Sequence, residues 1–241
     1  MGILGRFGGS PEEKARKLKA RVTQKYGDPT GRQKAIAQLG EMRTPEAVRS
    51  LMARFTITVD PHTTDADEKE QVFELVKAFG ADAVPPVREF LQRVNAASSW
   101  ALRLLEALLP ENELIGVAID TLRAIGNEYT RDPEKKTVLL HYLAGKSDPR
   151  VAPAVLPFLE DPSDDVKIAA ITSLAPRRYE PAREPLLHLV TTPEIARRVK
   201  SAAIAALHES ELGVQGFREK VEAALSDPYF IDKGGVIKKR G

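Results

Sequence analysis

The chain has 241 residues and a formal net charge of +2; hydrophobic residues make up 42% of it and charged residues 29%. This composition is sufficient for a packed core, and no apolar run approaches the roughly 18 residues that a membrane-spanning helix requires. The absence of cysteine excludes disulfides and thiolate metal sites and fits a reducing compartment. Because residues 1–7 are also too short for the apolar region of a signal peptide, we expect a cytoplasmic protein.

The first predicted elements are a short N-terminal segment and a capping helix. We expect residues 1–10 to be flexible, although Ile3, Leu4 and Phe7 could act as an apolar hook for a partner. An amphipathic helix over residues 11–26 would then cap the start of the fold.

Helix pairs follow, and proline marks many of their starts. Asp-Pro occurs six times, and Thr-Pro occurs at residues 44–45 and 192–193. An Asp or Thr side chain caps free backbone amides, and proline at the first helical position loses no hydrogen bond. Most of these dipeptides therefore predict helix starts. The second helices of the pairs are predicted at residues 29–39, 66–79, 98–109, 133–144, 162–174 and 193–208, and the first helices at 45–55, 84–94, 111–125, 149–159, 180–190 and 213–225.

An internal repeat indicates the architecture. The nonamers Val166–Leu174 and Val199–Leu207 are nearly the same string, 33 residues apart. Positions five, six and nine of each copy are small, aliphatic or aromatic, which is the spacing of one helix face. Repeats of this length predict stacked helix pairs that bury one another's apolar faces. The weaker copies end at Leu39, Phe79, Leu108 and Leu143.

The chain here resembles the HEAT-repeat family and, more loosely, its bacterial short-repeat members. The resemblance covers roughly residues 28–225 and implies an all-α fold, a right-handed α-solenoid of about six helix pairs whose second helices line the concave side. HEAT domains mostly bind proteins, and a minority bind DNA or act as lyases on bound pigments. The residues that carry the resemblance are Asp161, Pro162, Asp165, Val166, Lys167, Ala169, Ala170 and Leu174, with the copy at Val199–Leu207.

Two segments interrupt the repeat. Residues 55–59 alternate apolar and polar side chains in the manner of a short strand. Residues 229–238 predict either a hairpin around Gly234-Gly235 or an extended tail, which packs on the last repeat or is ordered by a partner. We therefore divide the chain into a flexible segment at 1–10, a solenoid at 11–225 and a basic tail or hairpin at 226–241.

Charge is unevenly distributed along the chain. Residues 1–27 carry seven Lys or Arg and two Glu, and residues 226–241 carry four and two Asp, so the intervening body is acidic. An acidic body is poorly suited to phosphate neutralisation, so nucleic-acid binding is not expected. We expect the charges at the two basic ends to be solvated. Alternatively, these ends could contact an acidic protein surface, an anionic membrane or RNA.

The sequence contains no recognisable catalytic motif, and we predict no catalytic residue, cofactor or metal. The four histidines, His62, His141, His188 and His208, lie in different repeats without metal-ligand spacing. The acidic segment 60–67 lacks the glycine and the bidentate glutamate of a calcium loop, which favours helix-capping acids. Adjacent acids such as Asp164-Asp165 point apart on a helix and serve its dipole.

A basic residue recurs at the second position of four nonamers, at Arg32, Lys136, Lys167 and Lys200. These side chains could form a basic stripe for a partner. In HEAT proteins this position often pairs with an aspartate of a neighbouring repeat, and Asp161 and Asp165 are placed for such a ladder. Val72 and Ala101 would interrupt it.

Helix geometry predicts a partner-binding groove. If the second helices line the concave wall, positions opposite the core stripe would present apolar anchors and a charged rim. The alternative is that tight curvature buries these positions between adjacent helices, and Trp100 is expected in the core. The predicted partner-binding residues are Phe73, Lys77, Leu102, Glu106, His141, Ile168 and Thr172.

The function predicted from these patterns is a non-catalytic adaptor or scaffold that binds a protein or peptide. An alternative is a HEAT-like enzyme of the DNA glycosylase or lyase type, which would need a positive concave face with aromatic residues and a central carboxylate. A third is a membrane or nucleic-acid tether that acts through the basic ends. The patterns do not indicate an oligomeric state.

Overall fold

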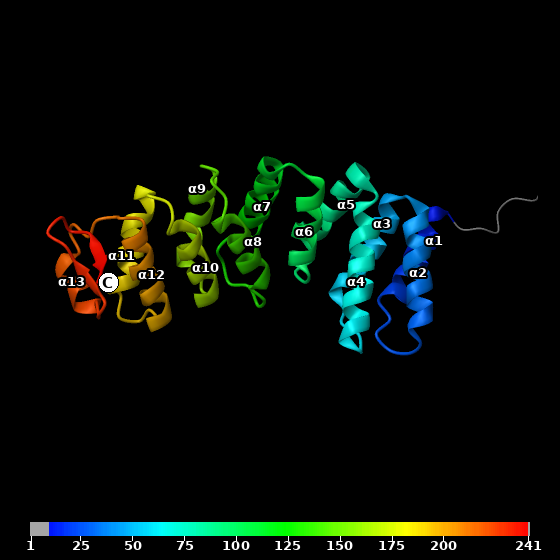
Figure 1. Cartoon of the computed structure of the whole chain (residues 1–241), viewed down its shortest axis with the longest axis horizontal. Helices are drawn as coiled ribbons and strands as arrows, with labels where there is room; N and C mark the ends of the chain where they lie inside the picture. Colours follow the sequence, from blue (N-terminus) through cyan, green and yellow to red (C-terminus); the bar gives the residue numbers. More distant parts are fainter. Residues whose placement is uncertain (1–9, 241) are drawn as a thin grey trace, which may run out of the picture. The chain divides into compact units, whose positions relative to one another are not determined.

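The computed structural model describes residues 10–240. These residues form thirteen α-helices, several short 3₁₀ segments and one two-stranded hairpin, joined by loops (Figure 1). The helices pack in pairs as a HEAT-like repeat fold, which confirms the predicted all-α class. They divide into two compact units, with the boundary between Leu114 and Ile115. The single solenoid over residues 11–225 and its handedness stay predictions.

The N-terminal unit contains six complete helices. Helix α1 packs on α2 and α3, α3 packs on α5, and α4 and α5 each pack on α6. The elements are α1 (Pro11–Val22), α2 (Pro29–Met42), α3 (Pro45–Met52), η1 (Ala53–Thr56), α4 (His62–Lys77), η2 (Gly80–Ala83), α5 (Val84–Arg93) and α6 (Ser98–Leu108).

The C-terminal unit holds the strongest copies of the repeat. Helix α10 packs beside both α8 and α12, and α11 pairs with α12. Helix α7 (Glu111–Ile125) contains the unit boundary. It is followed by α8 (Glu134–Ala144), α9 (Val151–Val155), η3 (Leu156–Glu160), α10 (Asp164–Leu174), η4 (Glu180–Ala182), α11 (Arg183–Thr191), α12 (Arg197–Glu209), α13 (Arg218–Ala224), β1 (Tyr229–Ile231) and β2 (Ile237–Lys239).

Side-chain caps mark the starts of the first three helices, α1, α2 and α3. Asp28 accepts a hydrogen bond from the Thr30 amide at 3.0 Å, and Thr44 accepts one from Ala47 at 3.2 Å. Ser10 caps α1, so the predicted flexible segment ends before it, and residues 1–9 with the apolar hook lie outside the described residues. One expected start is wrong, because α12 begins at Arg197, four residues after Pro193. Asp227-Pro228 precedes a strand, in the segment where a hairpin was predicted.

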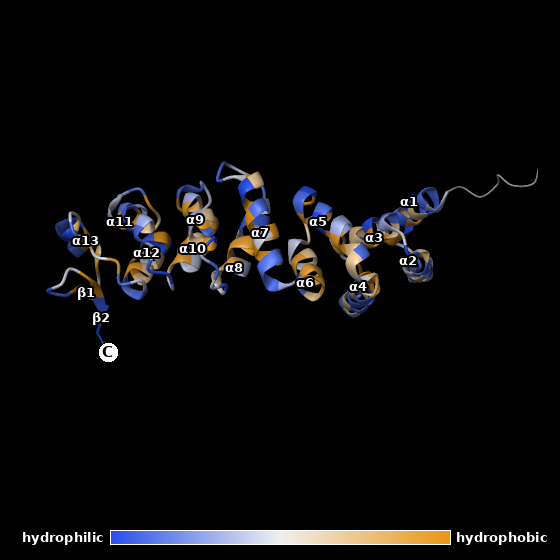
Figure 2. Ribbon diagram, turned by 90° about the horizontal axis from the view of Figure 1, so that it is seen from above, coloured by the Kyte–Doolittle hydropathy of each residue, from blue (hydrophilic) through white to orange (hydrophobic). Residues whose placement is uncertain are grey.

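The predicted helix faces form the core. Ala170, Ala203 and Leu207 are each 0% exposed, as are their equivalents Ala35 and Leu139. Figure 2 shows apolar and hydrophilic residues sharing the same helices, as expected where one face of each helix is buried. Burial of small residues at the fifth position lets adjacent helices approach closely.

The two interruptions of the repeat have different outcomes. Residues 55–59 are not a strand, because they pair with no other segment among residues 10–240; η1 ends at Thr56, and Ile57 and Val59 are buried. The C-terminal segment does form the hairpin, with Ile231 opposite Ile237 and a turn at Gly235 with φ of +78°. The hairpin packs on the last repeat, where the His208 ring lies 3.0 Å from the Ile237 carbonyl.

A network of buried charges joins α2, η1 and α4 in the N-terminal unit. The Glu68 carboxylate accepts two hydrogen bonds from Arg32, at 2.6 and 3.0 Å, and one from Arg54 at 2.9 Å. Arg54 also reaches Asp65 at 2.8 Å, and Lys69 contacts the other Asp65 oxygen at 2.7 Å. Asp65 therefore links Arg54 and Lys69 from within α4. It does not cap the helix, whose N-cap residue Pro61 makes no side-chain hydrogen bond, so the capping interpretation of segment 60–67 is wrong for Asp65.

Candidate protein-binding surface

The seven predicted partner-binding residues fall into two sets. Four lie in the N-terminal unit on α4 and α6, and three lie in the C-terminal unit on α8 and α10. The first set is Phe73, Lys77, Leu102 and Glu106, and the second is His141, Ile168 and Thr172.

In the N-terminal unit, the predicted apolar anchors are covered. Phe73 and Leu102 are each only 5% exposed. The prediction that these two side chains are exposed is therefore wrong, and the alternative that they are buried between helices is correct. The Phe73 ring lies 6.4 Å from that of Trp100, and the Arg103 guanidinium covers it at 4.2 Å. Lys77 is exposed and pairs with Glu74 on its own helix, so it is available at the surface.

Trp100 is half-buried in the same aromatic cluster. Its ring stacks on Phe55 at 4.7 Å with an interplanar angle of 19°. Arg103 lies over it at 5.1 Å and is held by two hydrogen bonds to Glu70. Trp100 therefore contributes to the core, as expected, while Arg103 seals the cluster from outside.

In the C-terminal unit, three neighbouring second helices present a shared surface. His141 and Thr172 are exposed, and Ile168 is half-buried beside them. Because α10 packs beside both α8 and α12, the equivalent positions of all three helices lie next to one another. We call this surface the α8–α10–α12 face; its residues are Thr137, His141, Ile168, Thr172, Ser201 and Ala205.

The hydroxyl groups of this face are already satisfied. Thr137 donates to the Glu134 carbonyl at 2.7 Å, Thr172 to Ile168 at 2.9 Å and Ser201 to Arg197 at 3.0 Å. Each hydroxyl thus bonds back to its own helix. What remains toward the outside is the carbon of these three side chains, with Ile168, Ala205 and the imidazole of His141.

Charged residues border the face at the starts of its helices. Arg198 of α12 forms ion pairs with Asp164, at 3.5 Å, and with Asp165 of α10. The face is therefore a strip of small and hydroxyl-bearing side chains around Ile168, together with His141, and it has a charged edge.

The predicted ladder forms in part. Lys136 pairs with Asp161 of the next repeat at 2.7 Å, and Arg32 pairs with Glu68 of the next second helix. All four side chains are buried, so these residues do not form a basic stripe for a partner. Val72 and Ala101 interrupt the ladder as expected, and both are fully buried.

Two predicted rungs of the ladder are wrong. Lys167 lies 3.7 Å from Asp164 on its own helix, and Lys200 donates to the Pro193 carbonyl at 3.2 Å. The link from α12 to α10 is made instead by Arg198, two residues before Lys200. Arg198 lies nearer the start of α12 than Lys200 does, and there it reaches Asp164 and Asp165 at the start of α10.

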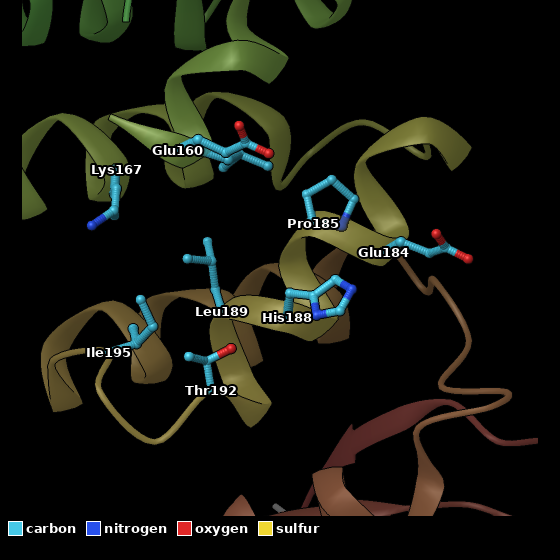
Figure 3. Close-up of a pocket in the computed structure, with 9 residues that line it drawn as sticks. Glu160, Lys167, Glu184, Pro185, His188, Leu189, Thr192 and Ile195 are labelled. Carbon is cyan, nitrogen blue, oxygen red and sulfur yellow. The ribbon is translucent and has the colours of Figure 1, made fainter. Parts of the chain in front are cut away.

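A cavity of about 470 Å³ lies between two consecutive helix hairpins of the C-terminal unit. Its apolar lining comes from the buried Leu159 and Leu189 and from Pro185 and Ile195. Figure 3 shows Glu160 and Lys167 on one side of the opening and His188, Leu189, Thr192 and Ile195 on the other. An apolar floor with a polar rim suits a side chain of a bound protein segment.

The sequence did not indicate this cavity, because most of its lining comes from first helices and connecting turns rather than second helices. A signal was nevertheless available. Glu184 and His188 are four residues apart in α11 and therefore share one face of that helix. Within residues 10–240, no three His, Cys, Asp or Glu side chains are grouped so as to hold a metal ion.

The fold and the face define the class of helical repeat proteins, in which antiparallel helix hairpins stack in register. Residues 127–208 match the family model of HEAT repeats. This segment extends from the turn before α8 to the last turn of α12, so it contains both the α8–α10–α12 face and the 470 Å³ cavity.

Two solved structures show weaker likeness. One, described as lipid–protein interactions in lipovitellin, is 15% identical over 87% of this chain, with a TM-score of 0.40; the chain spans 24% of that chain's length. The other, human deoxyhypusine hydroxylase in complex with glycerol, is 14% identical over 89% of this chain and 95% of its own, with a TM-score of 0.35. None of the curated proteins compared with the chain matches it. No helix within residues 10–240 is long and apolar enough to span a membrane.

Proposed function

We propose that the protein is a non-catalytic binding module, an adaptor or scaffold, that docks another protein on the α8–α10–α12 face. One observation supports this most. Three helices in register present short side chains whose hydroxyls, at Thr137, Thr172 and Ser201, are bonded to their own helices. A partner can cover them without stripping water from an unsatisfied polar group, which avoids the main desolvation cost of burial.

The rigidity of the face lowers a second cost of binding. Short β-branched or small residues have few rotamers to lose, and their helices are fixed by the buried Lys136–Asp161 pair beneath them. Most of the ordering entropy is therefore already lost in the free protein. Ile168 is the one aliphatic anchor at the centre, and the charged edge at Arg198 would set the orientation of the partner.

The 470 Å³ cavity adds a place for a single side chain. Leu159, Leu189 and Ile195 provide an apolar floor, and Glu160 and Lys167 offer charges of both signs at the rim. An extended segment of the partner could insert an aliphatic or aromatic residue here while its main body rests on the face. This arrangement supports a peptide-binding element within a larger protein interface.

The test is partner capture with matched variants. Tagged full-length chain is purified from its native host and the co-purifying proteins are identified by mass spectrometry. Thr172→Arg places a long charged side chain at the centre of the face, and Ala223→Arg makes a comparable change at an exposed position of α13.

The proposal expects a protein that is retained by the wild-type chain and by Ala223→Arg but lost with Thr172→Arg. Equal retention by all three would remove the face from the proposal. Turnover of a substrate by the purified chain would overturn its non-catalytic part. The cytoplasmic location stays a prediction.

A further inference from the structure

Helix α1 and the loop that follows it carry a dense positive charge. Residues 10–27 contain six Lys or Arg and two Glu, which leaves a net charge of +4. Lys14, Lys17 and Arg21 are exposed, and their spacing of three and four residues places them along one side of the helix. Lys25 and Tyr26 follow in the loop and are exposed as well. We call these five residues the α1 basic surface.

Within the described residues, no acid of the neighbouring helices forms an ion pair with this surface. Helix α1 packs on α3, and α3 packs on α5, but the acids of α3 and α5 already have partners. Glu46 pairs with Arg49, and Glu89 pairs with Arg49 at 2.9 Å and with Arg93 at 2.8 Å. Among residues 10–240, Glu41 of α2 forms no ion pair with the surface either. Its positive charge therefore faces solvent.

The two acids of α1 itself are explained by the start of the helix. A hydrogen bond from Ser10 and, to a smaller extent, the charge of Arg16 lower the pKa of Glu12, so Glu12 interacts with residues outside the α1 basic surface. Glu13 lies in the first turn, where the helix dipole favours a negative charge. Neither acid is placed there by the cations of the surface.

The positions of the cations weaken the helix. Lys14 lies in the first half of α1, where the dipole disfavours a positive charge. Lys14 and Lys17 are three residues apart, and Lys17 and Arg21 are four apart, which are the spacings at which like charges on a helix repel each other. Arg21, in the last turn, is the one of these three that the dipole favours. Helix stability therefore does not explain the α1 basic surface, whereas a ligand outside the fold would.

The surface is held in place by the fold and already faces outward. The apolar side of α1 is buried against α2 and α3, with Ala15 and Val22 0% exposed and Leu18 7% exposed. Figure 2 shows α1 as a predominantly hydrophilic helix. Because its apolar side is in the core, α1 would contact a ligand through its cations and would not need to refold.

We propose that the α1 basic surface attaches the protein to an anionic lipid bilayer. This attachment goes beyond the proposed function and does not depend on it. Three of the four cations are lysines, whose ammonium groups are strongly hydrated and act as point charges. The surface potential of anionic headgroups attracts such charges without a fitted site. A fitted site for a protein carboxylate would favour arginine, which pairs with it at two points.

Apolar groups beside the cations favour a bilayer over a nucleic acid. The Tyr26 side chain is 85% exposed, and tyrosine is enriched where the headgroups meet the acyl chains. The sequence before α1 also contains Ile3, Leu4 and Phe7, which lie outside the described residues. A bilayer takes up both the charges and the apolar side chains, whereas the phosphates of a nucleic acid attract only the charges.

Co-sedimentation of the full-length chain with lipid vesicles tests the inference. The vesicles contain phosphatidylcholine alone or with about 30% phosphatidylglycerol, which supplies a negative surface potential. The test variant is Lys14→Glu with Lys17→Glu. The control is Arg131→Glu with Lys220→Glu, at two exposed cations of the C-terminal unit, so both variants lower the net charge from +2 to −2. Circular dichroism confirms that each variant is folded.

We expect wild-type chain to sediment with the anionic vesicles but not with the neutral ones, and to be released at about 0.5 M salt. Lys14→Glu with Lys17→Glu should lower the partition coefficient at least about tenfold, because each cation near an anionic bilayer contributes about fivefold. The control should leave it nearly unchanged. A further variant, Lys17→Gln with Arg21→Gln, removes charge without reversing it and should give a smaller loss in the same direction.

Three results would overturn the inference: no sedimentation with the anionic vesicles, equal sedimentation with the neutral ones, or an equal loss in the control variant. An RNA oligonucleotide or a polyglutamate peptide that displaces the chain from the vesicles, and binds it with the same dependence on Lys14 and Lys17, would overturn it in favour of a nucleic acid or an acidic protein. Any of these failures leaves the proposed function standing, because partner capture is scored separately with Thr172→Arg.

Discussion

Arg54 is fully buried, and its Nε atom lies 2.9 Å from Oε2 of Glu68, the same oxygen that Arg32 Nε contacts at 2.6 Å. One carboxylate thus links two guanidinium groups from η1 and α2. Neither partner could be buried alone, because an unpaired charge in the core is strongly unfavourable. The N-terminal unit therefore depends on this network being complete.

Removal of Arg54 should destabilise the N-terminal unit severely. Arg54→Ala leaves Glu68 with one partner and Asp65 without its guanidinium, and breaking a buried pair typically costs about 3–5 kcal/mol. The free energy of unfolding can be followed in urea by the fluorescence of Trp100, the only tryptophan, which stacks on Phe55 in this unit. Arg93→Ala, which removes an exposed ion pair with Glu89, is the control and should change little. Similar midpoints for both variants would contradict the assigned role.

The same network predicts a loss of stability in acid. Burial alone would raise the pKa of Glu68 and Asp65, but hydrogen bonds from Arg32 and Arg54 to Glu68, and from Lys69 and Arg54 to Asp65, lower both pKa values below their usual 4.5 and 3.8. The folded state then binds protons less readily than the unfolded state. The stabilisation is complete above these usual values and is lost as the pH falls through the lowered pKa values.

Urea unfolding measured between about pH 7 and pH 3 checks this dependence. We expect the midpoint reported by Trp100 to fall on the acid side of this range for wild-type chain. Glu68→Gln should be less stable at neutral pH and should show a shallower decline in acid. A decline as steep as that of the wild type would assign the pH dependence to other groups.

The Lys136–Asp161 pair should have a comparable role in the C-terminal unit. Lys136 Nζ is buried; it donates to the Asp161 carboxylate and to the Glu128 carbonyl at 2.6 Å, and it lies 6.0 Å from the centre of the Phe158 ring. Asp161→Asn leaves that ammonium without a counter-charge and should cost about 3 kcal/mol. Asp164→Asn, in a partly exposed pair with Arg198, should cost much less. Thermal unfolding followed by circular dichroism compares the two variants. An equal loss of stability in both would contradict the role of the Lys136–Asp161 pair as a buried, stabilising ion pair.

Helix packing within the repeats predicts a size limit at the fifth position of the nonamer. Ala203 is 0% exposed between α12 and its neighbours, so Ala203→Leu should destabilise by about 1–3 kcal/mol through overpacking. Ala205, two residues further on, is only half-buried on the α8–α10–α12 face, and Ala205→Leu should be tolerated. The melting temperatures of the two variants give the comparison. A tolerated leucine at 203 would show that the helices are farther apart than described.

The sequence predicted the helices well because their signals are local. Caps at Asp28 and Thr44 act within a few residues, and apolar spacing identifies the face that Ala170 and Ala203 bury. The predicted positions of the helix ends were less accurate. Helix α1 ends at Val22 rather than at residue 26, and α13 begins at Arg218 rather than at residue 213. Fraying and turn geometry decide such boundaries, and these depend on contacts that a single sequence does not display.

The candidate site was harder to predict because exposure depends on neighbouring helices. Phe73 and Ile168 occupy equivalent positions of the repeat, yet Phe73 is covered by Arg103 while Ile168 is half-exposed. Arg103 has no equivalent near Ile168, and only the three-dimensional arrangement reveals this. The buried pairs were partly foreseeable, since Lys136 and Asp161 follow the ladder, whereas Arg54 with Glu68 does not follow the repeat.

The most direct measurement is site-specific photo-crosslinking in the native host. A photoreactive amino acid is placed at position 172 in the centre of the face, and separately at position 223 on α13. We predict a crosslinked protein product from position 172 that is absent from position 223 and is suppressed by a charged residue at position 168. Products of equal yield from both positions, or none from position 172 while the chain still captures its partner, would contradict binding through the α8–α10–α12 face.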